Sequence, residues 1–295
     1  MYLIQYIIAR FFIFILLLLP EKLRFKFGNF LGSLTYLLIK KRREVAYYNL
    51  KMAFPEKTDT EIEIISKKSF KIMIKAFLCT LWFEKYLQNK ANMKIVNQES
   101  FEKSFSKGRG LVAATMHLGN MEASVIAAGE HEIVTVAKKQ RNPYINEYMM
   151  KNRSKYIKME VIEKDKETSR KLMKKIEEKK IIALFSDHRD KGAIVNFFEK
   201  EAKAPTGAVS LAIKYDIPLI LVYNILNDDN TTSVFVGDEI MLEKTGNFKQ
   251  DVQRGTQKLI DEIEKVIRKH PEQWMWFHDR WNIHSALKKV KKGNR

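Results

Sequence analysis

The sequence predicts an α/β fold, with a mixed, largely parallel sheet flanked by helices and a membrane helix at the amino terminus. Three observations predict this architecture. From Met93 onward, short apolar runs of strand length alternate with helical patterns, as expected for a sheet covered on both faces. Before Met93 the patterns are helical, and residues 2–19 are almost entirely apolar. No linker rich in proline, glycine or serine interrupts the chain, so we expect one catalytic domain with an appended membrane segment.

Residues 1–20 form the candidate membrane segment. Residues 2–19 are apolar except for Gln5 and Arg10, and about 18 to 20 such residues can just cross a hydrocarbon core. A signal peptide is the weaker interpretation, because no basic region precedes the stretch and no small-residue cleavage site follows it. Arg10 is costly in lipid, so a helix that spans the bilayer and one that lies in its interface both remain open. Basic residues after the segment predict that the rest of the chain stays cytoplasmic; they are Lys22, Arg24, Lys26 and the run 40–43.

Residues 21–92 are expected to form a helical, membrane-proximal segment. Leu23 to Ile39 is a second apolar stretch, either a helix packed on the membrane face of the protein or an ordinary buried helix. The sequence Thr58-Asp-Thr-Glu61 is a capping box, which predicts a long amphipathic helix running to about Leu87.

Residues 93–285 are expected to form the α/β core, and residues 286–295 a basic tail. Asn142-Pro143 begins a predicted helix that carries Arg153, and another helix is predicted from about residue 248 to His270, ended by Pro271. Seven short runs predict the strands, at 94–97, 111–116, 133–137, 159–162, 181–186, 217–223 and 233–236.

The charge balance predicts an anionic partner. The chain has 53 Lys and Arg against 35 Asp and Glu, a formal net charge of +18, so its long-range field attracts anions. Nucleic acid is disfavoured, because the sequence has no paired Cys/His finger, no ribonucleoprotein motif and no basic zipper. An anionic membrane surface and an acidic protein remain. The single cysteine, Cys79, excludes an intramolecular disulfide and is consistent with a reducing, cytoplasm-facing domain.

The candidate catalytic residues lie in the segment 110–122. An apolar run ends at His117, then Gly119 and Asn120 supply turn chemistry, and Glu122 opens a helical pattern. His117 is therefore expected at the carboxyl end of a buried strand, where open α/β sheets bind ligands. A turn at Gly119 and Asn120 can fold the Glu122 carboxylate back to the imidazole, as suits a general base. The alternative is a hydrogen-bonded histidine at a strand end and a glutamate that only favours a helix N-terminus.

A second polar run is expected at the same edge of the sheet. Residues 186–192 follow another buried strand, and they carry Asp187 and Arg189, which we expect to orient the site or contact substrate. A metal site at Asp187 and His188 is a poor interpretation, because too few ligands are nearby. No GxSxG elbow or suitable cysteine supplies a nucleophile, so we expect the attacking hydroxyl to belong to the substrate.

The segment His117-Leu-Gly-Asn-Met-Glu122 resembles the H-x4-D/E motif of the glycerolipid and lysophospholipid acyltransferase superfamily, in the form found in the late acyltransferases of lipid A biosynthesis. Three other segments resemble that family in order and position. They are Arg43 to Pro55, Asp187 to Phe198 with Ala204 to Ala212, and His270 to Trp281. The departures are Met121 where tryptophan is usual, Glu199 where glycine is usual, and Asn224 near a position often held by arginine.

The resemblance implies an enzyme, an O-acyltransferase that moves a fatty acyl group from an acyl-carrier-protein thioester to a hydroxyl of a lipid A precursor. It implies that His117 is the general base, that Glu122 orients and charges its ring, and that Arg153 helps to hold an anionic group or an oxyanion. The further residues expected to contact substrate are Gly119, Asn120, Asp187 and Arg189. The implied location is the cytoplasmic side of the bacterial inner membrane. Transfer from a thioester needs no metal or other cofactor, and the implied partners are the acidic acyl-carrier protein, the lipid acceptor and the membrane.

Two alternatives differ in function. One is an acyltransferase of the same superfamily that acts on another glycolipid or glycerolipid. The other is a non-enzymatic membrane protein that binds lipid or an acidic protein through its basic surface.

Overall fold

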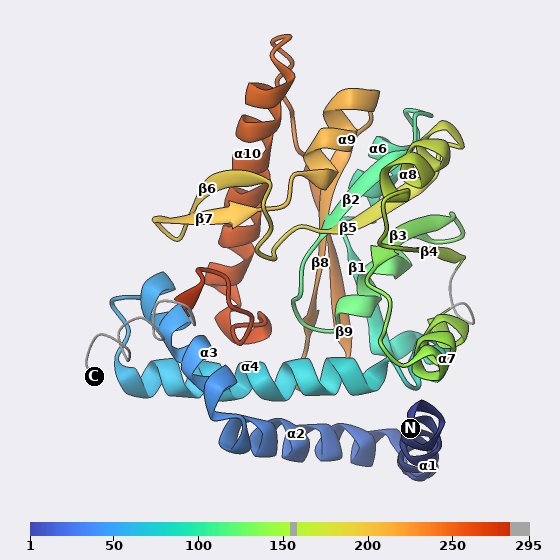
Figure 1. The fold of residues 1–295 in the computed structure, drawn as a ribbon, viewed down its shortest axis with the longest axis vertical. Coiled ribbons are helices and arrows are strands. Elements are labelled where there is room, and N and C mark those ends of the chain that lie inside the picture. The colour runs from blue at the N-terminus through green and yellow to red at the C-terminus, as the bar shows by residue number, and fades with distance from the viewer. Residues whose placement is uncertain (154–157, 284–295) are drawn as a thin grey trace.

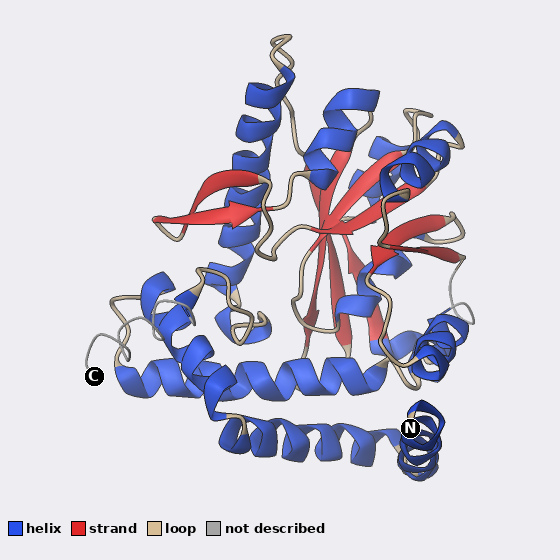
Figure 2. Ribbon diagram, in the orientation of Figure 1, coloured by secondary structure: helices blue, strands red, loops and turns tan. Residues whose placement is uncertain are grey.

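The computed structural model describes residues 1–153 and 158–283, and it has an α/β fold (Figures 1 and 2). Its seven-stranded sheet is made of β1 (Met93–Val96), β2 (Leu111–Thr115), β3 (Ile133–Ala137), β4 (Met159–Glu163), β5 (Ile181–Phe185), β8 (Leu219–Leu226) and β9 (Thr232–Glu239). The order of these strands in the sheet is β1-β9-β8-β2-β5-β3-β4. Neighbouring strands are parallel except β8 and β9, which form an antiparallel pair. This confirms the predicted mixed, largely parallel sheet. The basic tail predicted at 286–295 lies outside the described residues.

Each of the seven predicted runs overlaps a strand of this sheet. A separate hairpin of β6 (Ala193–Phe197) and β7 (Lys200–Ala204) was not predicted. Its two-residue turn, Phe198 and Glu199, has positive φ at both positions, a conformation that usually requires Gly or Asn.

The sheet is buried on both faces, which explains why the strand of the candidate motif has no alternation of polar residues. Along β2, Val112 and Ala114 pack into the apolar cluster that contains α9 (Gly207–Tyr215) and α10 (Phe248–Lys269). Leu111 and Ala113 pack into the cluster on the opposite face. The carboxyl ends of β2, β3, β4 and β5 therefore share one edge, because these strands are parallel.

Helices cover the sheet and extend beyond it (Figure 2). The predicted capping box begins α4, since the Thr58 side chain and Glu61 each accept a hydrogen bond from the other's backbone N–H. The long helix predicted to reach Leu87 is instead two helices, α4 and α5, separated at residues 80–82. The helices are α1 (Tyr2–Leu18), α2 (Glu21–Leu38), α3 (Lys40–Ala53), α4 (Asp59–Cys79), α5 (Phe83–Gln88), α6 (Gln98–Phe105), α7 (Pro143–Arg153), α8 (Thr168–Glu177), α9 (Gly207–Tyr215) and α10 (Phe248–Lys269), with 3₁₀ turns η1 (Lys90–Asn92), η2 (Met121–Ala128) and η3 (Pro271–Gln273).

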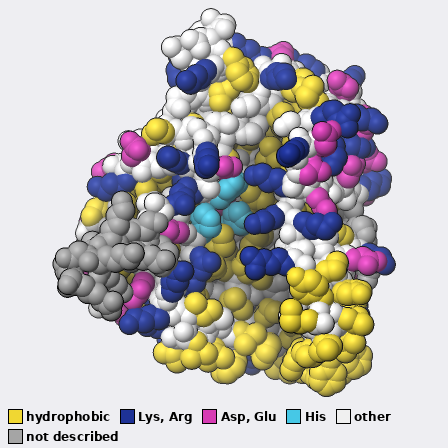
Figure 3. Space-filling model, viewed as in Figure 1, with side chains coloured by type: hydrophobic (Ala, Val, Ile, Leu, Met, Phe, Trp, Pro, Cys, Tyr) yellow, Lys and Arg dark blue, Asp and Glu magenta, His cyan; other side chains and the backbone are white. Residues whose placement is uncertain are grey.

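The amino-terminal helices form an exposed apolar surface. α2 packs closely on α4, because a Cβ at Gly32 would lie 2.5 Å from the Cα of Lys71. In the described part of the chain, no helix combines the length and apolar character needed to cross a bilayer. Apolar side chains nevertheless gather over α1 and α2 at the lower end of Figure 3. The exposed ones are Tyr2, Leu3, Ile4, Ile7, Ile8, Phe11, Phe12, Phe14, Ile15 and Leu18 on α1, and Leu23, Phe27, Phe30, Leu37 and Leu38 on α2; together they are called the apolar face.

Candidate functional site

The register of two parallel strands brings His117 and Asp187 together. Thr115 at the end of β2 pairs with Phe185 at the end of β5, and His117 and Asp187 each follow two residues later. Their side chains meet, since His117 Nδ1 lies 2.8 Å from Asp187 Oδ1. The prediction that these residues lie at one edge of the sheet is confirmed.

The Asp187 carboxylate accepts three hydrogen bonds. Oδ1 contacts His117 Nδ1, and Oδ2 accepts from the backbone N–H of His117 at 2.8 Å and from the indole N–H of Trp274 at 2.8 Å. The Asp187 side chain is 2% exposed, whereas the His117 side chain is 22% exposed. Because Nδ1 faces the buried carboxylate, the opposite side of the ring, which carries Nε2, is left available to a substrate.

The mutual attraction of His117 and Asp187 outweighs the cost of their burial. Burial lowers the pKa of His117, but the charge and hydrogen bond of Asp187 raise it further, so this pKa lies above its ordinary value. Burial likewise raises the pKa of Asp187, but the charge of His117 and hydrogen bonds from His117 and Trp274 bring it well below its usual range. An ionised Asp187 can only accept hydrogen bonds, so a neutral His117 carries its proton on Nδ1. Nε2 is then the basic nitrogen.

Two other histidines lie near this pair. Burial lowers the pKa of His188 and of His278, although the Asp187 charge acts in the opposite direction on both. Figure 3 shows histidine side chains gathered in a hollow at the middle of one face, with Lys and Arg around them. Among these three histidines, only His117 combines a raised pKa with a direct carboxylate partner, and this makes it the best candidate base.

Glu122 does not contact the imidazole as the sequence led us to expect. It lies on η2 and forms an ion pair with Arg153 at the end of α7, through Nε at 3.1 Å and through Nη2. The carboxylate that fixes the His117 tautomer is that of Asp187, which corrects the predicted role of Glu122. Arg153 thus pairs with the Glu122 carboxylate, and its expected role in holding an anionic group or an oxyanion stays a prediction.

The turn between His117 and Glu122 is shaped by its glycine. Gly119 has φ +54°, and a Cβ there would lie 2.5 Å from the carbonyl oxygen of Asn224, so a larger residue would not fit. The Asn120 side chain is fully buried, with its amide nitrogen 3.6 Å from the sulfur of Cys79 and 3.5 Å from Thr232 Oγ1. Both residues shape the turn, and their contact with substrate stays a prediction.

The carboxyl-terminal segment holds the other side of this turn. Leu118 and Trp274 form an isolated antiparallel bridge. The N–H of Met275 donates to the carbonyl of His117 at 3.2 Å, and the N–H of Gly119 donates to the carbonyl of Gln273 at 3.0 Å. The sequence analysis missed Trp274 as a site residue, because no local pattern shows that an indole 87 positions from Asp187 will reach its carboxylate.

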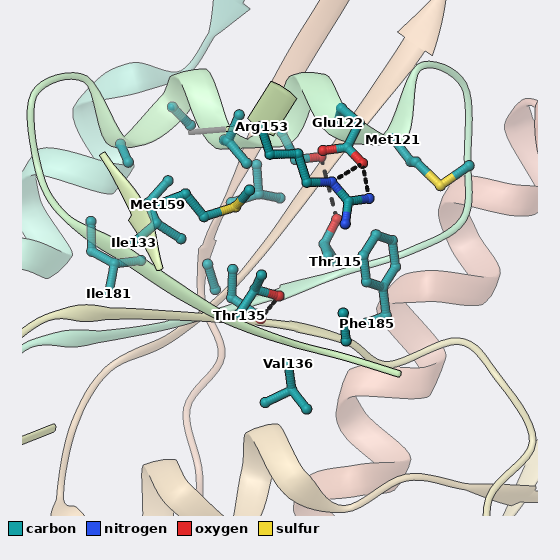
Figure 4. A pocket seen from close by; sticks show the side chains of 18 of the residues that line it. Thr115, Met121, Glu122, Ile133, Thr135, Val136, Arg153, Met159, Ile181 and Phe185 are labelled. Carbon is teal, nitrogen blue, oxygen red and sulfur yellow. Dashed lines mark hydrogen bonds and ion pairs between the residues drawn. The ribbon is translucent and has the colours of Figure 1, made fainter. Parts of the chain in front are cut away.

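An apolar pocket begins beside the pair of His117 and Asp187. The His117 ring stacks on Phe185 with 4.2 Å between ring centroids, and Phe185 lines the pocket. Glu122, Thr115 and Phe185 lie toward one end of it in Figure 4, and Ile133, Met159 and Ile181 lie toward the other. The pocket has about 750 Å³ of empty space, its open mouth included. Its lining residues are Phe101, Ala113, Thr115, Met121, Glu122, Ser124, Val125, Ala127, Ala128, Ile133, Thr135, Val136, Ala137, Arg153, Met159, Ile181, Ala183, Phe185 and Val222.

The pocket follows the direction of the strands beneath it. Ile181, Ala183 and Phe185 occupy alternate positions of β5 and all line the pocket. From Ile181 to Phe185 a strand advances about 13 Å, at roughly 3.3 Å per residue. The cavity is therefore an elongated slot that runs from the carboxyl edge of the sheet toward the first residues of its strands. Phe197 and Phe198 do not line this slot; they pack against Trp274, Trp276 and Trp281.

Exposed cations surround the same edge of the sheet. Arg189 is exposed two residues after Asp187, and its predicted contact with substrate stays open. Among the described residues there is no group of three or more His, Cys, Asp or Glu side chains placed to hold a metal ion. The exposed cations in the segments that follow β3, β4 and β5 are Lys138, Lys139, Arg141, Lys164, Lys166, Arg189 and Lys191, which are together called the basic rim.

The chain is similar to known acyltransferases. The family model of the bacterial lipid A biosynthesis acyltransferase matches residues 1–283. Among solved structures, the 1-acyl-sn-glycerophosphate acyltransferase PlsC from Thermotoga maritima has 13% sequence identity and a TM-score of 0.34, over 82% of this chain and 97% of that chain. No curated protein matches the chain. The match over residues 1–283 shows that the chain belongs to the bacterial lipid A biosynthesis acyltransferase family.

Proposed function

We propose that this protein transfers a fatty acyl group from an acyl-carrier-protein thioester to a hydroxyl of a lipid A precursor, with His117 as the general base. Membership in the family supports acyl transfer. The observation that carries the proposal is the shared position of Phe185, which stacks on the His117 ring and also lines the apolar slot. A fatty chain in the slot would therefore have its thioester end beside the basic nitrogen of His117, Nε2.

The proposed reaction uses Nε2 of His117. This nitrogen takes the proton of the acceptor hydroxyl as its oxygen attacks the thioester carbonyl, and Asp187 stabilises the imidazolium that forms. The tetrahedral intermediate then collapses, the carbon–sulfur bond breaks, and the proton passes from the imidazolium to the leaving thiolate. The products are an ester on the acceptor and a free thiol on the carrier.

Arg153 is placed to stabilise negative charge at the mouth of the slot. Its guanidinium has donors beyond those that engage Glu122, and a planar, fixed cation suits an oxyanion that develops at the thioester carbonyl. In this proposal Glu122 contributes to catalysis by holding Arg153. The Glu122 side chain is 10% exposed and that of Arg153 is 23% exposed, so solvent screens their pair only in part.

The surface features support the proposed partners. The basic rim surrounds the edge of the sheet where His117 lies, as suits an acidic carrier protein and the phosphate of its prosthetic arm. The apolar face on α1 and α2 can lie in the interface of the inner membrane on its cytoplasmic side, where a lipid acceptor is available. Covering an exposed apolar surface of this kind with lipid is favourable. No metal or other cofactor is part of the proposed reaction.

The experiment that tests the proposal is acyl transfer with purified protein. The protein is mixed with acyl-carrier protein carrying a fatty thioester and with a lipid A precursor in detergent micelles, and the products are identified by mass spectrometry. We expect ester formation that falls by about 10²- to 10⁴-fold in His117→Ala, the usual contribution of a general base.

Two controls sharpen this test. His270→Ala removes a histidine at the end of α10 that does not contact Asp187, and it should transfer at the rate of the unmodified protein. Near-normal transfer by His117→Ala would contradict the assigned base. Ester formation on a glycerolipid, with none on the lipid A precursor, would contradict the acceptor and would favour the related glycerolipid activity.

A further inference from the structure

The carboxylate that orients His117 is itself held by a tryptophan. The indole N–H of Trp274 donates to Asp187 Oδ2 at 2.8 Å, on the oxygen that does not contact the imidazole ring. The same Oδ2 also accepts the backbone N–H of His117. With two donors on Oδ2, the carboxylate plane is fixed, and Oδ1 is left with Nδ1 of His117.

Trp274 has little freedom to move. Its side chain is 1% exposed, and its ring packs edge-on against Trp276 at 4.6 Å and against Phe197 at 5.8 Å. Its backbone is held on both sides, because its carbonyl accepts the Ser69 hydroxyl at 2.5 Å and the residue bridges to Leu118. The indole is therefore a rigid donor, fixed between α4 and the loop that follows β2.

We propose that Trp274 is a positioning residue for acyl transfer, whose indole N–H fixes the Asp187 carboxylate so that Nε2 of His117 faces the acceptor hydroxyl. This inference rests on the proposed function, because it names a residue that acts through the general base. It also extends the Asp187 and His117 pair to a third member that lies in the carboxyl-terminal segment.

The geometry gives Trp274 two effects on the base. It prevents rotation of the carboxylate, which would carry Oδ1 away from Nδ1. It also shares the negative charge of Asp187, since a hydrogen bond to a carboxylate stabilises its ionised form. Without the indole donor, more of that charge acts on the ring, and the pKa of His117 is expected to rise.

The chain provides a matched control for this idea. Trp276 is also fully buried, lies in the same aromatic cluster, and uses its own indole N–H, which donates to the carbonyl of Pro271 at 2.5 Å. Trp274→Phe and Trp276→Phe therefore remove the same atoms and one indole hydrogen bond each. Only Trp274→Phe removes a contact with Asp187.

The experiment measures kcat and KM against pH for the unmodified protein and both variants. In Trp274→Phe we expect kcat to fall by about 10- to 100-fold, the size of effect that follows the loss of one hydrogen bond to a charged group. KM should change little, and the acid limb of the profile should move to higher pH. Trp276→Phe should keep the unmodified profile. An unmoved or lowered acid limb in Trp274→Phe, or an equal rise in both variants, would overturn the proposal.

A second variant and a second readout cover the case in which phenylalanine prevents folding. Benzothienylalanine at position 274 has the shape of tryptophan with sulfur in place of the N–H, so it deletes only the donor. The pKa of His117 is then read by NMR from labelled imidazole rings, which requires no substrate. A raised pKa in this variant supports the role of Trp274 even if the acceptor of the reaction is wrong, and an unchanged pKa refutes that role even if the unmodified protein transfers acyl groups.

Discussion

Asp187→Asn changes one oxygen of the carboxylate that contacts the His117 ring into an NH₂ group, and the structure predicts where that group will point. If it replaces Oδ2, it opposes two donors, the backbone N–H of His117 and the indole N–H of Trp274. Each buried donor left without a partner costs about 1 to 3 kcal/mol. If it replaces Oδ1, it faces only Nδ1 of His117, which can become an acceptor by moving its proton to Nε2. The second arrangement is therefore preferred by roughly 2 to 6 kcal/mol.

The preferred arrangement removes the base without unfolding the protein. With the proton on Nε2, the ring cannot accept a proton from the acceptor hydroxyl, and the same exchange in a Ser-His-Asp triad lowers kcat by about 10⁴. We expect Asp187→Asn to lose about 10²- to 10⁴-fold in kcat. The asparagine oxygen still accepts from Trp274 and from the His117 backbone, so a cooperative thermal transition should remain.

The pH dependence gives this prediction a second measurement. In the unmodified protein the pKa of His117 is raised, so activity should rise with pH through a midpoint above about 6.5. The stability that His117 contributes is present below about pH 6.5 and is lost as pH rises through the folded pKa. The stability from Asp187, whose pKa is lowered, is present above about pH 3.9 and is lost as pH falls through the folded pKa. Both of these pH dependences of stability should weaken in Asp187→Asn.

The assay compares initial rates at saturating donor with circular-dichroism melts of the same samples. Glu122→Gln is the matched control, because it also converts a buried carboxylate to an amide but does not contact the imidazole. It should keep the pH midpoint of the unmodified protein. A folded Asp187→Asn protein that transfers within threefold of the normal rate would refute the reasoning about the tautomer.

Three further predictions follow from the pocket mouth, the slot and the apolar face. The losses of kcat in Glu122→Gln and Arg153→Gln should not add in the double variant, because each residue acts through the same ion pair. A double-mutant cycle should give a coupling energy of about 1 to 3 kcal/mol. Additive losses would contradict this prediction. Ala183→Leu adds three carbons to the wall of the slot. When acyl donors of different chain length compete, this variant should prefer chains about two to four carbons shorter than the unmodified protein does. Each buried methylene contributes about 0.8 kcal/mol, which is roughly a fourfold preference. An unchanged preference for acyl-chain length would mean that the fatty chain does not bind in this slot. Phe12→Glu on the apolar face should weaken binding to anionic vesicles at least tenfold in a sedimentation assay. The control is Phe248→Glu, which changes an exposed phenylalanine at the start of α10 and should not weaken binding. Equal effects of the two changes would contradict vesicle binding through the apolar face.

Most of the sheet could be predicted from the sequence because its strands are buried on both faces. Such strands appear as apolar runs of a recognisable length, and each of the seven overlaps a strand. The hairpin of β6 and β7 could not be seen in this way, since β7 is Lys-Glu-Ala-Lys-Ala and only its alanines are buried. Its turn could not be predicted either, because Phe198 and Glu199 both have positive φ, a conformation in which glycine or asparagine is usual.

The site was predicted in part, and the error has a local cause. His117 and Asp187 follow neighbouring strands with equal offsets, so their meeting at one edge followed from the strand pattern. The expected fold-back of Glu122 did not occur, because the chain enters the 3₁₀ turn η2 at Met121 and Glu122 pairs with Arg153. A short spacing along the chain cannot distinguish these two geometries. The contact of Trp274 with Asp187 depends on tertiary packing alone, so no local sequence pattern predicts it.

The bridge between Leu118 and Trp274 also determines when the site can exist during synthesis. The strands that carry His117 and Asp187 leave the ribosome well before the segment that supplies the indole and the bonds to the turn. A nascent chain can therefore bury much of its sheet while its imidazole is still poorly oriented. The site would therefore become able to catalyse its reaction only late in translation, after the amino-terminal helices have already had time to fold.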